Sequence, residues 1–260
     1  MNLKISYYLL FAFMSFVSYS QIEPERHLIP KSETLNSTDK LLKFDYKQLI
    51  LPSIGIVYGI VGIENHTLRF INGTIQHELG EHIDRKLSID DFSQYAPAAC
   101  GLGLDIFGLN SKHSLKQRSI ALTCSYIIMT AVVLSLKYST KIERPDKTSF
   151  NSFPSGHTAT AFAGAEFLWQ EYKDHSIWIG IAGYTIATGT GVFRMLNNRH
   201  WLTDIATGAG IGMLSTKLAY WLYPGINRTL FRQTQKSVGM GISPDFSTDY
   251  FGIKISISGI

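Results

Sequence analysis

Charged residues are scarce in this chain. Asp, Glu, Lys and Arg make up 17% of its 260 residues, below the roughly 25% of average soluble domains, whereas 45% are hydrophobic and 12% aromatic. The shortage favours a helical protein in or beside a membrane, although a mean hydropathy of +0.06 is low for a protein made only of spanning helices. The formal net charge of +4 includes no basic block, so nucleic acid is not expected as a partner.

Cysteine is almost absent, and internal repeats and low-complexity segments are missing altogether. The two cysteines, Cys100 and Cys124, both lie in apolar segments and can form at most one disulfide. We interpret them as free thiols that pack as small hydrophobic side chains. For a chain of this length without repeats, one domain is the simplest expectation.

The N-terminus has the features of an export signal. In residues 1–20, Lys4 precedes an apolar stretch at 8–17 and a small-x-small site, Ser18-Tyr19-Ser20. Cleavage after Ser20 and retention as an uncleaved anchor both remain open, and either one predicts a protein of the cell envelope. Residues 21–47 are polar and mixed in charge, and we expect a linker there.

Six apolar runs follow, and their lengths and content of Ala, Gly, Leu and Ile predict helices. The sequence therefore predicts an all-α fold, a bundle of about six core helices between residues 48 and 225. For residues 226–260 we expect a tail, in which alternating apolar residues predict a short β-hairpin. Several runs are shorter than the roughly 20 residues that span a bilayer, so short spans and buried helices of a soluble protein both remain open. The runs are 48–63, 93–109, 119–136, 157–169, 176–193 and 201–223.

Features within the runs indicate how they pack. Gly208 and Gly212 have the spacing that permits close helix contact. Asp105 and Glu166 interrupt apolar runs, and ionisable groups there should face the bundle interior. Basic residues between the second and third runs and after the sixth, expected to be cytoplasmic, would put the ends of the third and fifth runs on the outer face. A cleaved signal conflicts with this count of six spans, which leaves the topology open. These basic residues are Lys112, Lys116, Arg118, Arg228, Arg232 and Lys236.

The segment from Arg194 to Asp204 carries a cation, a histidine and a carboxylate. If His200 and Asp204 fall in the first turns of a helix, their spacing of four puts both side chains on one face. Asp204 can then accept a hydrogen bond from the Nδ1–H group of His200 and leave Nε2 free to attack. Arg194 suits bidentate contact with phosphoryl oxygens. A His–Asp pair that only ties a helix together has the same spacing.

Two earlier segments carry related chemistry. Pro154-Ser-Gly-His157 combines a helix N-cap, Ser155, with a glycine, Gly156, that admits close approach of an anion, and places His157 to protonate a leaving oxygen. Lys137 and Arg144-Pro145 supply two cations for a phosphate. Taken alone, the first is an ordinary capped helix start and the second a pair of interfacial cations.

Together, Lys-x6-Arg-Pro, Pro-Ser-Gly-His and Arg-x5-His-x3-Asp resemble the type 2 phosphatidic acid phosphatase superfamily. The resemblance covers about residues 137–204 by motif and the flanking helices by hydropathy. One departure is Phe193, where the family usually has a serine that could contact phosphate. The resemblance implies a helical bundle with an active site of loops at one end, and no metal or other cofactor.

Carried over by position, the resemblance gives each motif residue a role. His200 is expected to be the nucleophile that takes the phosphoryl group, Asp204 to orient it and His157 to protonate the leaving oxygen. The phosphate-binding residues are expected to be Lys137, Arg144, Ser155, Gly156 and Arg194.

The predicted function is a metal-independent phosphatase, acting outside the cytoplasm on a membrane lipid phosphate monoester or pyrophosphate. Phosphatidic acid, phosphatidylglycerol phosphate, polyprenyl pyrophosphate and lipid A phosphates are all candidate substrates. A soluble periplasmic acid phosphatase, a vanadate-dependent haloperoxidase and a membrane scaffold without turnover are the alternatives. The motifs are complete, which argues against the scaffold, and the short, apolar chain argues against the haloperoxidase.

Overall fold

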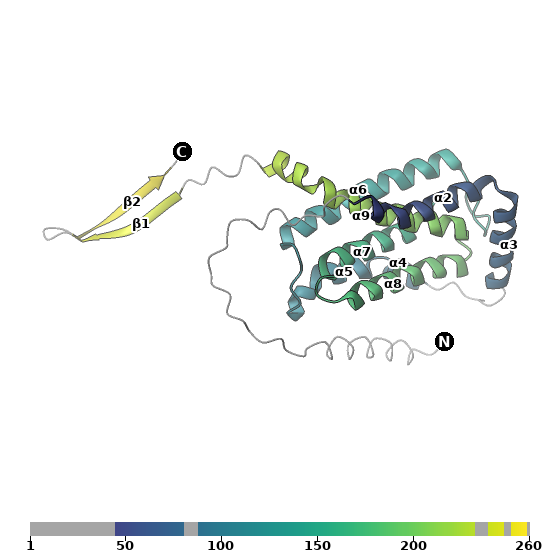
Figure 1. Ribbon diagram of the computed structural model, residues 1–260, viewed down its shortest axis with the longest axis horizontal. Coiled ribbons are helices and arrows are strands. Elements are labelled where there is room, and N and C mark those ends of the chain that lie inside the picture. The colour runs from purple at the N-terminus through teal and green to yellow at the C-terminus, as the bar shows by residue number, and fades with distance from the viewer. Residues whose placement is uncertain (1–44, 81–87, 232–238, 247–250, 259–260) are drawn as a thin grey trace. The chain divides into compact units, whose positions relative to one another are not determined.

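The computed structural model describes residues 45–80, 88–231, 239–246 and 251–258 (Figure 1). The predicted signal or anchor at 1–20 and nearly all of the linker at 21–47 lie outside these ranges. The described elements are η2 (Tyr46–Leu49), α2 (Ile50–Glu64), α3 (His66–Gly80), α4 (Ile89–Ser93), α5 (Ala96–Gly103), η3 (Leu104–Phe107), α6 (Leu115–Thr140), α7 (Gly156–Tyr172), α8 (Ile177–Leu196), α9 (Leu202–Phe231), β1 (Gly239–Phe246) and β2 (Phe251–Ser258).

The helical bundle predicted from the sequence is confirmed, with two differences. The run at 93–109 is not one helix: α4 ends at Ser93, Pro97 stands in the first turn of α5, and Gly108 has a φ of 82° after η3. Proline lacks the amide proton that would continue a helix, and positive φ favours glycine. The second difference is α3, which is too polar to appear among the apolar runs. The thiols of Cys100 and Cys124 are free, as predicted.

Helix α7 is the centre of the bundle, since it packs against α5, α6, α8 and α9 (Figure 1). Its alanines at 159, 161, 163 and 165 are fully buried, and such small side chains let neighbouring backbones approach closely. Because α7 begins at Gly156, its first turn carries the Pro-Ser-Gly-His segment, and the core helix therefore fixes the position of that segment.

The predicted close packing at Gly208 and Gly212 is confirmed. A Cβ atom on Gly208 would lie 2.5 Å from the carbonyl oxygen of Ser155, and one on Gly212 would lie 2.8 Å from the amide nitrogen of Ala163. Gly208 of α9 therefore packs against the backbone at the N-cap of α7, and Gly212 packs against the backbone within α7. No larger side chain fits there without moving one of the two helices.

Of the two ionisable residues expected to face the bundle interior, Glu166 does so, whereas the side chain of Asp105 is 37% exposed. Glu166 is buried, lies 2.6 Å from Lys217 Nζ, and accepts hydrogen bonds from Gln170 and Tyr184. A buried carboxylate with several partners avoids most of the cost of desolvation. Its pairing shows that the charges within the apolar runs are structural parts of the bundle.

Three of the expected loop charges lie in helices. Lys116 and Arg118 were expected among the cytoplasmic loop residues, but α6 starts at Leu115, where Ser114 and Gln117 form a capping box, and Arg228 lies in α9. Arg118 is consequently inside the helix and 2% exposed, where it pairs with Asp105 and donates to the carbonyl oxygen of Gly101 at 3.0 Å. It therefore carries no information about loop orientation.

Two helical segments, Tyr46–Glu64 and Leu115–Thr140, are long and apolar enough to cross a membrane by length and composition. Buried core helices of soluble proteins pass the same test, but only 17% and 28% of the two apolar windows are buried here. Large apolar side chains on their surfaces are instead exposed, namely Ile50, Leu51, Ile54, Val57, Ile60, Val61, Ile127, Val132 and Leu134. An exposed apolar surface of this extent is typical of a face that meets lipid or another protein.

The C-terminal elements agree with the prediction of a hairpin and revise the end of the last helix. Helix α9 runs through Pro224 to Phe231, beyond the boundary expected at 225, because a single proline bends a helix without having to end it. Strands β1 and β2 pair antiparallel, from Gly239 opposite Ser258 to Phe246 opposite Phe251.

The contact between α7 and α9 gives a test of the fold. We expect Gly212→Ala to lower the free energy of unfolding by about 1–3 kcal/mol, since the new methyl group overlaps the backbone of α7. The measurement is thermal unfolding in detergent. The control is Gly189→Ala in α8, where a Cβ atom meets nothing within 4 Å, so stability should be equal or slightly higher. Equal losses in both variants would contradict close packing at Gly212.

Candidate active site

The third motif joins the end of α8 to the start of α9. Arg194 lies in the last turn of α8, and His200 lies in the connecting loop, two residues before α9 begins at Leu202. His200 thus lies ahead of α9, whereas the motif spacing predicted it within the first turns of a helix. The expected pairing is present all the same: His200 Nδ1 lies 3.3 Å from Asp204 Oδ2, and both residues are 1% exposed. The other ring nitrogen, Nε2, is left for chemistry.

Asp204 is held by donors from two other segments. Its Oδ2 accepts a hydrogen bond from Ser152 Oγ at 2.5 Å and one from the backbone amide of Trp201 at 3.0 Å. Its carbonyl oxygen accepts the amide of Ser155 at 3.1 Å. The carboxylate is thereby fixed to the loop before α7 as well as to His200, so the second and third motifs form one unit.

The second motif begins α7. Ser155 is the N-cap, and its hydroxyl accepts the amide of Thr158 at 3.4 Å, as predicted for a helix start. The side chain of Ser155 is fully buried. A Cβ atom on Gly156 would meet only Val133, at 3.9 Å, so the backbone there is open to approach. His157 points its Nε2 at Asp91 Oδ1, 2.9 Å away.

The first motif brings two cations to the same region. Lys137, in the last turn of α6, donates from Nζ to the carbonyl oxygens of Asn151 at 2.5 Å and Ser152 at 3.4 Å. Arg144 lies in the loop after α6, and its Nε is buried without a hydrogen-bond partner in the described parts of the chain. Buried donors are rarely left unpaired, so this atom is available to an anion.

Arg194 is paired with two acids that sequence reasoning missed. Its NH1 lies 2.6 Å from Asp90 Oδ2 and 3.7 Å from Asp91 Oδ1, while Asn197 Nδ2 donates to Asp90 Oδ1 at 3.1 Å. Its Nε, like that of Arg144, is buried and unpaired among the described residues. The only sequence signal was two adjacent carboxylates in a chain poor in charge, and nothing in their spacing links them to an arginine 104 positions away.

The cations and histidines share one electrostatic field. Burial lowers the pKa of Arg144, and the positive charges of Arg194 and Arg199 lower it further. Burial lowers the pKa of His200 to about 4; Asp204 opposes that shift, and Lys137 and Arg194 add to it. His200 is therefore a neutral imidazole at neutral pH, which is the form that can act as a nucleophile.

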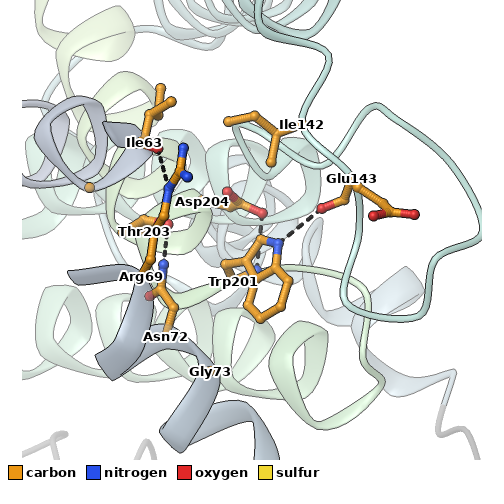
Figure 2. A pocket seen from close by; sticks show the side chains of 10 residues that line it. Ile63, Arg69, Asn72, Gly73, Ile142, Glu143, Trp201, Thr203 and Asp204 are labelled. Atoms are coloured by element: carbon orange, nitrogen blue, oxygen red, sulfur yellow. Dashed lines mark hydrogen bonds between the residues drawn. The ribbon is translucent and has the colours of Figure 1, made fainter. Parts of the chain in front are cut away.

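A pocket of about 300 Å³ lies beside this cluster (Figure 2). Arg69 and Asn72 of α3 line one side, Glu143 and Trp201 the other, and Asp204 lies between them. Hydrogen bonds fix its walls: Arg69 Nε donates to the carbonyl oxygen of Ile63 at 2.7 Å, and Trp201 Nε1 donates to that of Glu143 at 3.0 Å. His200 is not among the lining residues, so the pocket adjoins the His–Asp pair without containing it.

Comparison with known proteins tests the resemblance inferred from the motifs. The family model described as PAP2 superfamily matches residues 111–228, which include all three motifs. Residues 111–228 form a PAP2 domain. The resemblance inferred from the motifs is thus confirmed for this part of the chain.

Curated proteins and solved structures are similar to this chain. The chain is 34% identical over 210 residues to a lipid A 1-phosphatase of Porphyromonas gingivalis, a match that covers 75% of the chain and 47% of that protein. The chain thus spans about half the length of this relative. Two solved structures are similar to this chain. Aquifex aeolicus LpxE is 24% identical with a TM-score of 0.42, and the match covers 57% of this chain and 94% of LpxE. A transmembrane PAP2-type phosphatidylglycerolphosphate phosphatase of Bacillus subtilis is 19% identical with a TM-score of 0.49, and the match covers 73% of this chain and 100% of that protein.

The buried imidazole of the PAP2 domain gives a test. In the folded protein we expect His200 to titrate with a pKa of about 4, against about 6.5 in the unfolded chain. The unfolded chain binds the proton first, so the stability from this group is complete above pH 6.5 and is lost as the pH falls toward 4. NMR titration of the histidine rings, with His200→Gln for assignment, measures it. A His200 signal that titrates at pH 6 or above would contradict the lowered pKa, and one that titrates above pH 7 would also rule out a neutral imidazole at neutral pH.

Proposed function

We propose that this protein is a lipid phosphate phosphatase that hydrolyses a phosphate monoester or pyrophosphate through a phosphohistidine on His200. The observation that carries the proposal is the set of cations around that residue. Lys137 and Arg194 act electrostatically on one buried imidazole, Arg144 acts on Arg194 and Asp204, and the Nε atoms of both arginines are buried without partners in the described residues. A phosphate between them would satisfy both donors.

In the first chemical step, His200 Nε2 attacks phosphorus and forms a P–N bond while the bond from phosphorus to the leaving oxygen breaks. His157 gives its proton to that oxygen. Asp204 keeps the Nδ1 proton of His200 in place and stabilises the positive charge that develops on the ring. The two guanidinium groups and Lys137 stabilise the charge on the equatorial oxygens in the transition state.

In the second step, water attacks the phosphohistidine, and the P–N bond breaks. His157, deprotonated after the first step, accepts the proton of the water and returns to its starting form. Inorganic phosphate leaves, and His200 is again neutral, since burial disfavours its protonated form. The cycle is complete with residues of the three motifs, and no step requires a metal ion.

A lipid substrate is supported by the outer surface of the helices and by the relatives. The exposed apolar side chains of α2 and α6 suit a protein embedded in a bilayer, where a lipid can reach a site at the helix ends. The relative with 34% identity carries the name lipid A 1-phosphatase, which makes lipid A the first substrate to try. Lys137 lies in the last turn of α6 and Arg194 in the last turn of α8, which supports a site on the face that the sequence predicts to be outer.

The proposal is tested with a panel of lipid and soluble phosphates in EDTA. We expect purified protein in detergent to release phosphate from at least one lipid phosphate with EDTA present, and His200→Ala to reduce this by at least about 10³-fold, because the nucleophile is lost. Substrate labelled with ³²P should leave an acid-labile, base-stable label on the wild type during turnover.

Two further results give the control and the contradiction. Asp174→Asn alters a surface ion pair with Lys112, formed at 2.6 Å where α7 has already ended, and should leave the rate unchanged. The enzyme proposal fails if no lipid phosphate is hydrolysed faster by the wild type than by His200→Ala.

The orientation of the site is tested separately. Asp204 is in the first turn of α9, and Phe231 is the last residue of that helix. If α9 crosses the membrane and the site faces outward, a fluorescent protein fused after Phe231 will be cytoplasmic and fluorescent, and alkaline phosphatase fused there will be inactive. The opposite pair of results would place the site on the cytoplasmic face.

A further inference from the structure

We propose that Asp91 is the positioning residue for His157, so that the site contains two His–carboxylate pairs, one for each chemical role. The inference rests on the proposed phosphatase function and adds a residue that the three motifs do not contain. Its basis is the contact between His157 Nε2 and Asp91 Oδ1, at 2.9 Å, which joins the first turn of α7 to α4.

The position of Asp91 is fixed by the buried residue beside it. Asp90 is 1% exposed and is held by Arg194 NH1 at 2.6 Å and Asn197 Nδ2 at 3.1 Å. Ser93 Oγ lies 2.7 Å from Thr190 Oγ1 and makes a second link between α4 and α8. With α4 tied to α8 at both points, the carboxylate of Asp91 is presented to His157 on a rigid support, as a positioning group requires.

The two histidine pairs use opposite ring nitrogens. His200 meets Asp204 through Nδ1, whereas His157 meets Asp91 through Nε2. Among the described residues, Nε2 of His200 and Nδ1 of His157 have no hydrogen-bond partner. A carboxylate on one nitrogen fixes which nitrogen carries the other proton and how the ring is turned. With Asp91 on Nε2, the proton that His157 gives to the leaving oxygen is the one on Nδ1.

The surroundings of His157 show why it needs a carboxylate. Burial lowers its pKa, the charge of Arg194 from α8 lowers it further, and Asp91 and Asp90 from α4 raise it. A general acid must carry its proton at the operating pH. Asp91 partly offsets the effects of burial and Arg194, so without it the acid would lose its proton at a lower pH.

The first experiment varies the leaving group. General acid catalysis contributes about 10²–10⁴-fold when the leaving oxygen is strongly basic, and it matters little for p-nitrophenolate, which leaves without a proton. We expect Asp91→Asn to lower kcat about 10–100-fold on an alkyl phosphate and less than about 3-fold on p-nitrophenyl phosphate. Asp91→Glu should recover part of the alkyl phosphate rate, because it restores the charge.

The second experiment asks whether Asp91 acts through His157. In Asp91→Asn the basic limb of the pH profile of kcat should move to lower pH. Adding Asp91→Asn to His157→Ala should cost nothing more, since the group that Asp91 orients is already gone. Asp174→Asn is the matched control, in which a carboxylate that pairs with Lys112 is neutralised outside the site, and the profile should not move.

Several results would overturn the inference. If Asp91→Asn lowered kcat equally on both substrates and left the pH profile unmoved, Asp91 would be merely structural. If its loss of kcat added to that of His157→Ala in the double variant, Asp91 would not act through His157. A faster Asp91→Asn enzyme would mean that Asp91 obstructs His157. Failure of the phosphatase proposal is distinguishable from all of these, because then the wild type itself would be no faster than His200→Ala.

Discussion

The site depends on the carboxylate of Asp204 more than on any other group. Its Oδ2 accepts hydrogen bonds from Ser152 Oγ and the Trp201 amide and lies next to His200 Nδ1, and its backbone carbonyl oxygen accepts a hydrogen bond from the amide of Ser155. The loop before α7, the first turn of α7 and the start of α9 therefore meet at one residue. A carboxylate with three partners has a fixed orientation, and that orientation is passed to the imidazole of His200.

A second constraint is charge. Lys137, Arg144 and Arg194 must stay close together when no phosphate is bound, although each repels the others. The structure compensates with the buried Asp90 on Arg194 and with backbone carbonyl oxygens on Lys137, while the negative charges of Asp146 and Asp204 act on Arg144. Both arginines keep some capacity for an anion, because the Nε atom of each is buried without a partner among the described residues. The compensation thus holds the site together and leaves it receptive to phosphate.

Local patterns predicted most of the fold and the motif part of the site. Apolar runs of helical length gave the bundle, and Ser155 and Gly208 behaved as their chemistry requires. The two misses differ in kind. Arg118 was placed in a loop although the capping box of Ser114 and Gln117, a local pattern, marks the start of α6 before it. Asp90, in contrast, meets Arg194 across 104 positions, and such a pair is set by how helices are placed against each other, which spacing along the chain does not report.

The placement of α7 has a cause of its own. Its alanines and the glycines of α9 allow close approach but leave rotation and sliding weakly determined, since small side chains interlock little. Towards its C-terminus, Glu166 meets Lys217, and Glu171 meets both Tyr220 and His113. Each is a specific pair between buried groups, and a slipped helix would leave a buried charge without its partner. We interpret this polar layer as what sets the register of α7 and so, a few turns away, the position of His157.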